Sequence, residues 1–187
     1  GWSSLFGAAV PGRHEVVSNT CQANATNAND YWNAGTFGPD CEVYADILAE
    51  PTTATTYSLL LLRLVQVGGM TADGYGIRIT AGAPDSWEIL RTDNAVGTVL
   101  GAAFTQELDA DDKFGLEAIG SNLTAYYHNG TSWSALASRS DATYTAAGNI
   151  GIVDIVANQV TLDNFGGGTV VPAVIPVMLR QYRQRWS

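Results

Sequence analysis

Short segments in which apolar and polar residues alternate succeed one another along most of this chain, separated by turn-forming residues. In CEVYADIL, residues 41–48, the apolar side chains of Val43, Ala45 and Ile47 occupy every second position. A period of two places these side chains on one face of an extended backbone, which is typical of a strand with one buried face. We therefore predict a strand over 41–48.

Other segments carry the same kind of signal. YSLLLLRLVQV (57–67) is almost evenly apolar, which favours a central strand covered on both faces. DGYGIRITA (73–81) and SWEILRTD (86–93) are separated by Gly, Ala, Pro and Asp, and this pattern predicts a hairpin. NIGIVDI (149–155) and QVTLDNFGGG (159–168) predict two further strands.

The stretch 112–138 predicts three consecutive strands joined by tight turns. Apolar residues alternate in its first two segments, which the Gly-Ser pair at 120–121 separates. The Asn-Gly pair at 129–130 indicates a second hairpin, because both residues tolerate the positive φ of a type I′ turn. Residues 132–136 then return as the third strand.

These segments together predict an all-β fold. No segment before residue 174 repeats its apolar residues with the 3.6-residue period of a helix over ten or more positions. Roughly ten to twelve short strands in this length favour two packed antiparallel sheets, a sandwich or jelly roll. We predict one jelly-roll domain over 1–168 and a C-terminal arm over 169–187.

Composition and charge narrow the range of partners. Hydrophobic residues make up 46% of the chain and charged residues 14%, a balance that favours strands. The formal net charge is -9, and residues 1–179 hold 6 basic side chains against 18 acidic ones, a charge of -12. Such a body repels nucleic acid and acidic membrane surfaces. No run reaches the roughly 18 apolar residues of a membrane span, so we predict neither nucleic-acid binding nor membrane insertion.

The chain has two cysteines, Cys21 and Cys41, each in or beside a strand-like segment. Neighbouring strands can bring Cα atoms to the roughly 5.5 Å that a disulfide needs, so the two form a disulfide candidate. Two free buried thiols are the alternative.

The order of the segments resembles the concanavalin A-like lectin/glucanase jelly roll. The resemblance covers about residues 1–168 and rests on an early Trp2, on GPDCEVYADI, on the pair DGYGIRI and WEILRTD, on KFGLEAIGSNLTAYYHNGTSW, and on the closing VTLDNFGGG. The family includes lectins, glycoside hydrolases, adhesion modules and accessory domains of virions or cell surfaces. The resemblance therefore implies a fold and leaves the function open.

The resemblance also raises the question of an active site. The glucanase branch carries Glu-x-Asp-x-Glu on one strand, and the nearest match here is Glu42, Tyr44 and Asp46. The central carboxylate is replaced by a phenol, which is not an anion near neutral pH. Only His14 and His128 could serve a Ser-His-Asp triad, and they lie in unrelated segments. We predict that the protein is not an enzyme; a divergent glycoside hydrolase is the alternative.

A sugar site needs aromatic faces beside a few hydrogen-bonding groups. Two sets of residues on predicted hairpins have this composition: Tyr75, Arg78, Trp87 and Arg91 on one, and Tyr126 and Trp133 on the other. We predict these six as candidates for carbohydrate binding. The alternative is that the aromatic rings fill the core between the sheets.

Many proteins of the resembled family hold calcium near the last strand. Asp163 is the metal candidate on this basis, and a carboxylate that caps a turn is the alternative. No other cofactor is predicted.

The C-terminal arm combines prolines, aromatic residues and arginines. After Pro176 a short helix would place Leu179, Tyr182 and Trp186 on one face and Arg180, Arg183 and Arg185 on its flanks. The arm would either pack on its own sandwich or cross to a neighbouring subunit, whose acidic body would attract it.

A basic aromatic arm on an acidic β-sandwich resembles the accessory proteins of bacteriophage virions. We therefore expect a non-enzymatic virion structural, decoration or attachment protein that associates with itself or with other virion or surface proteins through the arm. The alternative is a secreted or surface carbohydrate-binding module with a glycan as its ligand. The expected location is the virion or the extracellular surface.

Overall fold

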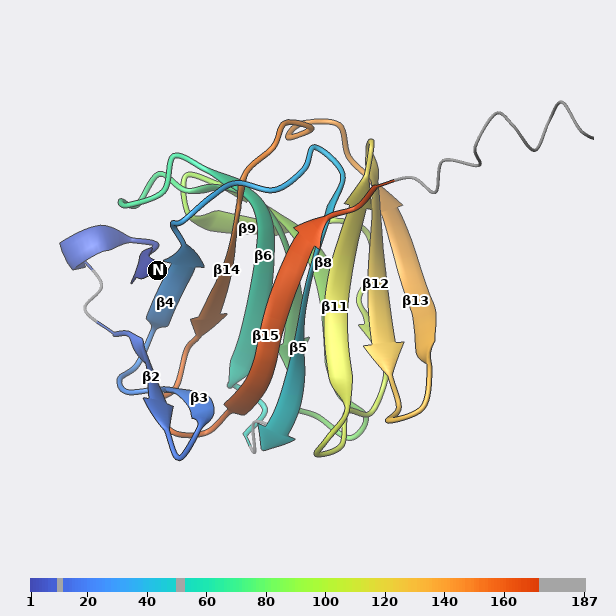
Figure 1. Cartoon of the computed structure of the whole chain (residues 1–187). Coiled ribbons are helices and arrows are strands. Elements are labelled where there is room, and N and C mark those ends of the chain that lie inside the picture. The colour runs from blue at the N-terminus through green and yellow to red at the C-terminus, as the bar shows by residue number, and fades with distance from the viewer. Residues whose placement is uncertain (10–11, 50–52, 172–187) are drawn as a thin grey trace, which may run out of the picture.

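The computed structural model describes residues 1–9, 12–49 and 53–171 and shows two antiparallel sheets packed face to face (Figure 1). The sheet at the back of this view has eight strands in the described residues. Its order is β1 (Trp2–Ser4), β4 (Ala28–Trp32), β14 (Asn149–Asp154), β6 (Tyr57–Val65), β7 (Asp73–Thr80), β8 (Ser86–Asp93) and β10 (Phe104–Thr105), and β9 (Val96–Val99) also pairs with β8.

The sheet that faces the viewer in Figure 1 has seven strands in the described residues. Its order is β13 (Trp133–Ser140), β12 (Asn122–His128), β11 (Lys113–Ile119), β5 (Cys41–Ala49), β15 (Thr161–Thr169), β3 (Thr20–Ala23) and β2 (His14–Val17). A short 3-10 helix, η1 (Gly7–Ala9), follows β1. The predicted all-β sandwich is confirmed.

The main core lies between the two sheets and is organised around an aromatic cluster. Trp87 on β8 is fully buried, and its ring centroid lies 6.1 Å from that of Phe104, 6.2 Å from that of Phe114 and 6.4 Å from that of Tyr127. Phe114 and Tyr127 belong to the facing sheet. These edge-on contacts join the sheets directly.

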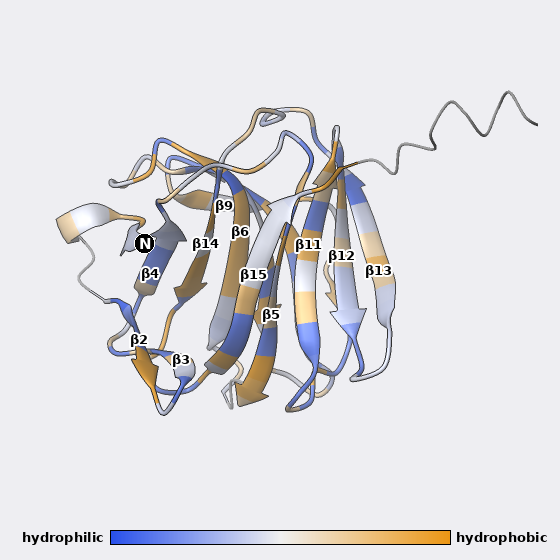
Figure 2. Cartoon of the chain, viewed as in Figure 1, coloured by the Kyte–Doolittle hydropathy of each residue, from blue (hydrophilic) through white to orange (hydrophobic). Residues whose placement is uncertain are grey.

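Strand β6 is covered on both faces, as its evenly apolar sequence predicts. Leu60 and Leu62 belong to the core between the sheets, whereas Leu61 and Leu64 pack with Leu5 in a second apolar cluster. Alternation is plain on β11, along which hydrophobic and hydrophilic bands follow one another (Figure 2). The strand predicted over 41–48 is β5, and its apolar positions are buried as predicted.

The predicted meander is present as β11, β12 and β13, but its second turn is of another kind. β12 ends at His128 and β13 begins at Trp133, so that four residues make the connection. Gly130 has a positive φ of 79°, but Asn129 does not, and its side-chain oxygen accepts hydrogen bonds from the backbone N–H groups of Thr131 and Ser132. The type I′ turn predicted for 129–130 is wrong, because the asparagine caps a longer loop with its side chain.

The disulfide candidate is not formed, since both cysteines are free, which is the alternative considered for them. Cys21 on β3 pairs with Leu162, and Cys41 on β5 pairs with Thr169, on opposite sides of β15. Their partners stand seven positions apart along β15, which corresponds to roughly 20 Å of strand. A disulfide requires about 5.5 Å between Cα atoms.

The assembly arm stays a prediction, because its residues lie outside the described part of the chain. These residues are Leu179, Arg180, Tyr182, Arg183, Arg185 and Trp186. Within 1–9, 12–49 and 53–171, no helix has the length and apolar character needed to cross a membrane.

Candidate functional site

The outer face of the seven-stranded sheet carries polar and aromatic side chains in rows that cross the strands. Alternation along β5 turns Glu42, Tyr44 and Asp46 toward this face, because the residues between them point into the core. β11 pairs with β5 so that Glu117 lies opposite Glu42, and Gly115 lies opposite Tyr44. Directly opposed residues share a face of a sheet, so these side chains are neighbours.

Strands β12 and β13 add aromatic rings to the same face. Tyr126 lies opposite Gly115, and Trp133 lies opposite His128. Trp133 is 44% exposed, and its ring centroid lies 5.1 Å from that of His128 and 6.4 Å from that of Tyr44. Trp133 thus reaches from β13 toward a tyrosine that stands three strands away.

These side chains enclose a cavity of about 240 Å³, which we call the outer-face cavity. It is lined by Glu42, Val43, Tyr44, Gly115, Leu116, Glu117, Tyr126 and Trp133. Two glycines make room for it. A Cβ on Gly115 would lie 2.7 Å from the Val43 carbonyl oxygen, and a Cβ on Gly166 would lie 2.7 Å from the Tyr44 ring. Because Gly115 has no side chain, the base of the cavity stays open. Because Gly166 has none, the Tyr44 ring can lie against β15.

The outer-face cavity holds two carboxylates of like charge. Within the described residues, neither Glu42 nor Glu117 forms an ion pair. Partial burial, together with the charge of Glu117, raises the pKa of Glu42. Burial and the charge of Glu117 also raise the pKa of Tyr126, whose hydroxyl group donates a hydrogen bond of 3.3 Å to Glu117 Oε1.

In the adjacent row on the same face, Asp46 lies between Lys113 on β11 and Asp163 on β15, and an ion pair balances its charge. Lys113 lies opposite Asp46, and its Nζ contacts Asp46 Oδ2 at 2.5 Å. Asn164 Nδ2 donates a second hydrogen bond of 2.8 Å to the same oxygen. The glucanase-like positions Glu42, Tyr44 and Asp46 lie on one face, but Asp46, the carboxylate at the third position, is held in an ion pair.

The structure brings together two of the six predicted sugar contacts and separates the others. Tyr126 and Trp133 line the outer-face cavity. Tyr75 and Trp87 are fully buried between the sheets, so their prediction as sugar contacts is wrong. Burial of their large apolar rings in the core, the alternative considered for them, is what the fold selects.

The two predicted arginines are engaged elsewhere. Arg78 lies opposite Glu88 on the eight-stranded sheet and donates to it from Nε over 2.7 Å. Arg91 contacts Asp93 at 2.8 Å and Asp141 at 2.9 Å. Neither of them lines the outer-face cavity, so Arg78 and Arg91 do not join Tyr126 and Trp133 in one site.

Sequence reasoning did not assign Gly115, Glu117 or His128 to a site. Glu117 and Gly115 alternate on β11 with buried apolar residues, and this alternation marks them as outward-facing. Their partners on β5 depend on the pairing of two strands separated by about 70 positions, which alternation does not reveal.

Asp163, the metal candidate, accepts a hydrogen bond of 2.7 Å from the backbone N–H of Asn164. In the described parts of the chain no group of three or more His, Cys, Asp or Glu side chains could hold a metal ion. The observed geometry is that of a carboxylate capping a bend in β15.

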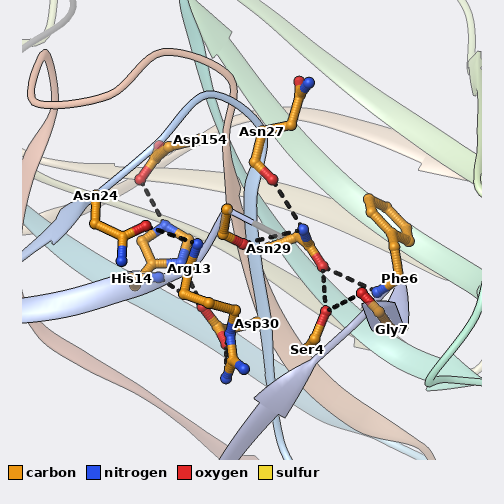
Figure 3. Close-up of polar contacts among 11 residues, drawn as sticks. Ser4, Phe6, Gly7, Arg13, His14, Asn24, Asn27, Asn29, Asp30 and Asp154 are labelled. Atoms are coloured by element: carbon orange, nitrogen blue, oxygen red, sulfur yellow. Dashed lines mark hydrogen bonds and ion pairs between the residues drawn. The ribbon is translucent and has the colours of Figure 1, made fainter. Parts of the chain in front are cut away.

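A second polar cluster links the two sheets at their other end (Figure 3). His14 on β2 contacts Asp30 Oδ2 through Nδ1 at 3.0 Å and Asp154 Oδ2 through Nε2 at 2.9 Å. Arg13 donates to Asp30 from Nε over 2.5 Å. Burial alone would lower the pKa of His14, but its hydrogen bonds to Asp154 and Asp30 outweigh burial and raise the pKa to about 9. The imidazolium therefore bridges two buried carboxylates.

This cluster is not arranged for nucleophilic catalysis. Both ring nitrogens of His14 face carboxylates, so the ring cannot take a proton from a serine. Burial and the charges of Asp154 and Asp30 raise the pKa of the neighbouring Cys21 thiol to about 12. Cys21 is thus a protonated and unreactive thiol near neutral pH.

Solved structures share this fold at low sequence identity. A carbohydrate-binding module, CBM66 from Bacillus subtilis, aligns over 90% of this chain and 95% of its own with a TM-score of 0.66 and 16% identity. The exoplasmic/lumenal domain of VIP36, in its Ca2+/Man3GlcNAc-bound form, aligns over 95% and 87% with a TM-score of 0.66 and 11% identity. A protein of unknown function with a galectin-like fold from Bacillus subtilis aligns over 89% and 88% with a TM-score of 0.61 and 12% identity.

No protein-family model matches the chain, and no curated protein matches it in sequence. The structural likenesses show that the chain has the concanavalin A-like sandwich, so the predicted resemblance in fold is confirmed. Nothing in these comparisons connects the chain with a virion, and the predicted virion role stays a prediction.

Proposed function

We propose that this protein is a carbohydrate-binding module and that its sugar lies in the outer-face cavity. The observation that carries the proposal is the arrangement of Trp133, Tyr44 and Tyr126 around a glycine-floored hollow that also contains two carboxylates.

This combination matches the chemistry of a sugar ring. One face of a pyranose presents C–H groups, which pack on aromatic rings, while its rim presents hydroxyl groups that donate hydrogen bonds. Trp133 offers an exposed ring, and Glu42 and Glu117 offer acceptors beside it. A cavity of about 240 Å³ is smaller than the roughly 300 Å³ at which pockets for drug-sized ligands begin, so the site suits about one sugar unit.

The comparisons support the proposal at the level of the fold. One similar structure is that of a carbohydrate-binding module, and another holds Man3GlcNAc. They identify no ligand for this chain.

Binding without hydrolysis is part of the proposal. Tyr44 occupies the position at which a glucanase-like strand carries its central carboxylate, and Asp46 is paired with Lys113. Release of shorter sugars from a bound oligosaccharide would contradict this part and would favour the divergent glycoside hydrolase.

Replacement of Trp133 tests the site. We expect Trp133→Ala to weaken binding by about tenfold or more, because a central aromatic anchor carries a large share of binding energy. The ligand is first found on a glycan array, and its affinity is then measured by isothermal titration calorimetry.

Trp2 offers a matched control, since it is 43% exposed and lies outside the outer-face cavity, against Trp32 and Phe165. Trp2→Ala should leave the affinity unchanged. Absence of any glycan ligand, or equal losses in both variants, would contradict the proposed function.

A further inference from the structure

We propose that the sugar recognised by the outer-face cavity is an amino sugar of the glucosamine type, whose protonated amine lies between Glu42 and Glu117. This inference rests on the proposed function and specifies its ligand class.

The first argument is the unbalanced carboxylate pair. Glu42 and Glu117 stand directly opposite each other on adjacent antiparallel strands, a position in which like charges repel. Asp46 on the same strand also faces a carboxylate, Asp163 on β15, but Lys113 on the other side of β5 supplies it with a cation. In the eight-stranded sheet, Glu88 faces Arg78. An ammonium group placed between Glu42 and Glu117 would remove the repulsion that the free protein carries.

The second argument is the lining of the cavity. Among the described residues that line the cavity there is no lysine, arginine or histidine, so these residues offer nothing that would attract a uronic acid, a sialic acid or a sulfated sugar. The negative faces of aromatic rings attract cations, and Trp133 and Tyr44 border the space in front of the two glutamates. Rings and carboxylates thus favour the same ligand charge.

A divalent metal ion is a weaker candidate for the same place. Calcium takes six to eight oxygen ligands, whereas the cavity supplies two carboxylates among aromatic rings. The described residues also contain no group of three acidic, histidine or cysteine side chains fit for a metal. The aromatic rings are better suited to an alkylammonium ion, which carries its charge on an organic group.

The test compares three oligosaccharides of equal length: a glucosamine oligomer, its N-acetylated form and a neutral glucose oligomer with the same linkage. Affinities are measured by titration calorimetry in a weakly acidic buffer in which the amine of glucosamine is protonated. We expect the glucosamine oligomer to bind about tenfold or more tightly than either of the others, because hydrogen bonds to charged groups are the stronger ones.

Three variants separate the site from the general acidity of the protein. Glu42→Gln and Glu117→Gln should each abolish the preference for the amine. Glu107→Gln removes an exposed carboxylate that lies outside the cavity, and it should keep the preference. The two cavity variants relieve a repulsion, so their melting temperatures should equal or exceed that of the unmodified protein.

The outcomes are distinct. Equal affinity for the three oligomers would overturn the amino-sugar inference and leave the proposed function standing, whereas binding to no glycan would overturn the proposed function as well. A preference that survives in Glu42→Gln and Glu117→Gln would overturn the inference, because the amine would then be recognised elsewhere. Binding that is lost on chelation of metal ions would assign the glutamates to a metal instead and would equally overturn it.

Discussion

Arg63 lies within a strand of apolar residues and is itself fully buried. Its guanidinium group donates to the carbonyl oxygens of Pro39 at 2.8 Å and Gly120 at 2.7 Å, and further bonds reach Tyr144 and Ala118. These carbonyls belong to loops and strand ends around the sandwich. One side chain therefore satisfies four carbonyl groups in three segments of the chain, which explains a cation inside an apolar run.

At the residue scale we predict that removing the charge of Arg63 strongly destabilises the protein. Arg63→Met should lower the free energy of unfolding by about 3–5 kcal/mol, because it leaves several buried carbonyl groups without a donor. Urea denaturation measures the change. Arg78→Met is the control: its side chain is 28% exposed and pairs with Glu88, so the expected loss is about 1 kcal/mol. Similar losses in the two variants would contradict the role given to Arg63.

At the scale of elements, β2 is joined to the opposite sheet by polar contacts. β2 belongs to the seven-stranded sheet, whereas Asp30 on β4 and Asp154 on β14 belong to the eight-stranded sheet (Figure 3). His14 connects the three strands with its two ring nitrogens. An edge strand of four residues with mostly exposed side chains is thereby held to the sandwich.

Because His14 holds these strands as a cation, we predict that the protein loses stability in alkali. The pKa of His14 is raised from 6.5 to about 9, so its stabilising effect is complete below pH 6.5 and declines as the pH rises through 9. The decline amounts to about 3 kcal/mol at most. Urea denaturation across this range measures it.

His14→Gln should be less stable than the unmodified protein at pH 6.5 and should show little further decline up to about pH 9. His128→Gln replaces the only other histidine and should keep the decline. An unchanged pH profile in His14→Gln would show that another group titrates.

At the scale of the whole molecule, the described strands account for the sandwich without residues 172–187, and Thr169, the first residue of the predicted arm, is the last residue of β15. The strands run from Trp2 to Thr169, and both apolar clusters consist of residues in this span. The arm adds three arginines to a chain whose other residues carry 18 acidic side chains against 6 basic ones.

We therefore predict different effects of the arm on stability and on assembly. Deletion of residues 172–187 should leave the melting temperature unchanged, because all the described strands and both apolar clusters lie outside the deleted span. The same deletion should reduce the mass measured by light scattering, since the arm is expected to contact a neighbouring acidic subunit. An unchanged mass would contradict the assembly role.

Much of the fold could be predicted from alternation alone, as β5, β11 and the β7–β8 hairpin show. The state of the two cysteines and the type of the turn at 129–130 could not be predicted in this way. Cys21 and Cys41 both lie on strands, but whether these strands are neighbours depends on β15, which comes more than 100 residues later. The turn depended on the side chain of Asn129, which formed local hydrogen bonds in place of a positive φ.

In the candidate site, too, some features follow from the local sequence pattern and others from the tertiary structure. Period-two alternation by itself determined which side of each strand faces solvent, because successive side chains of an extended backbone point in opposite directions. It therefore determined that Glu42 and Tyr44 share a face and that Glu117 points outward. Only the tertiary structure decided that Glu117 stands opposite Glu42 and that Trp133 reaches Tyr44. Pairing and register between distant strands are settled by the packing of the whole core, and no local pattern encodes them.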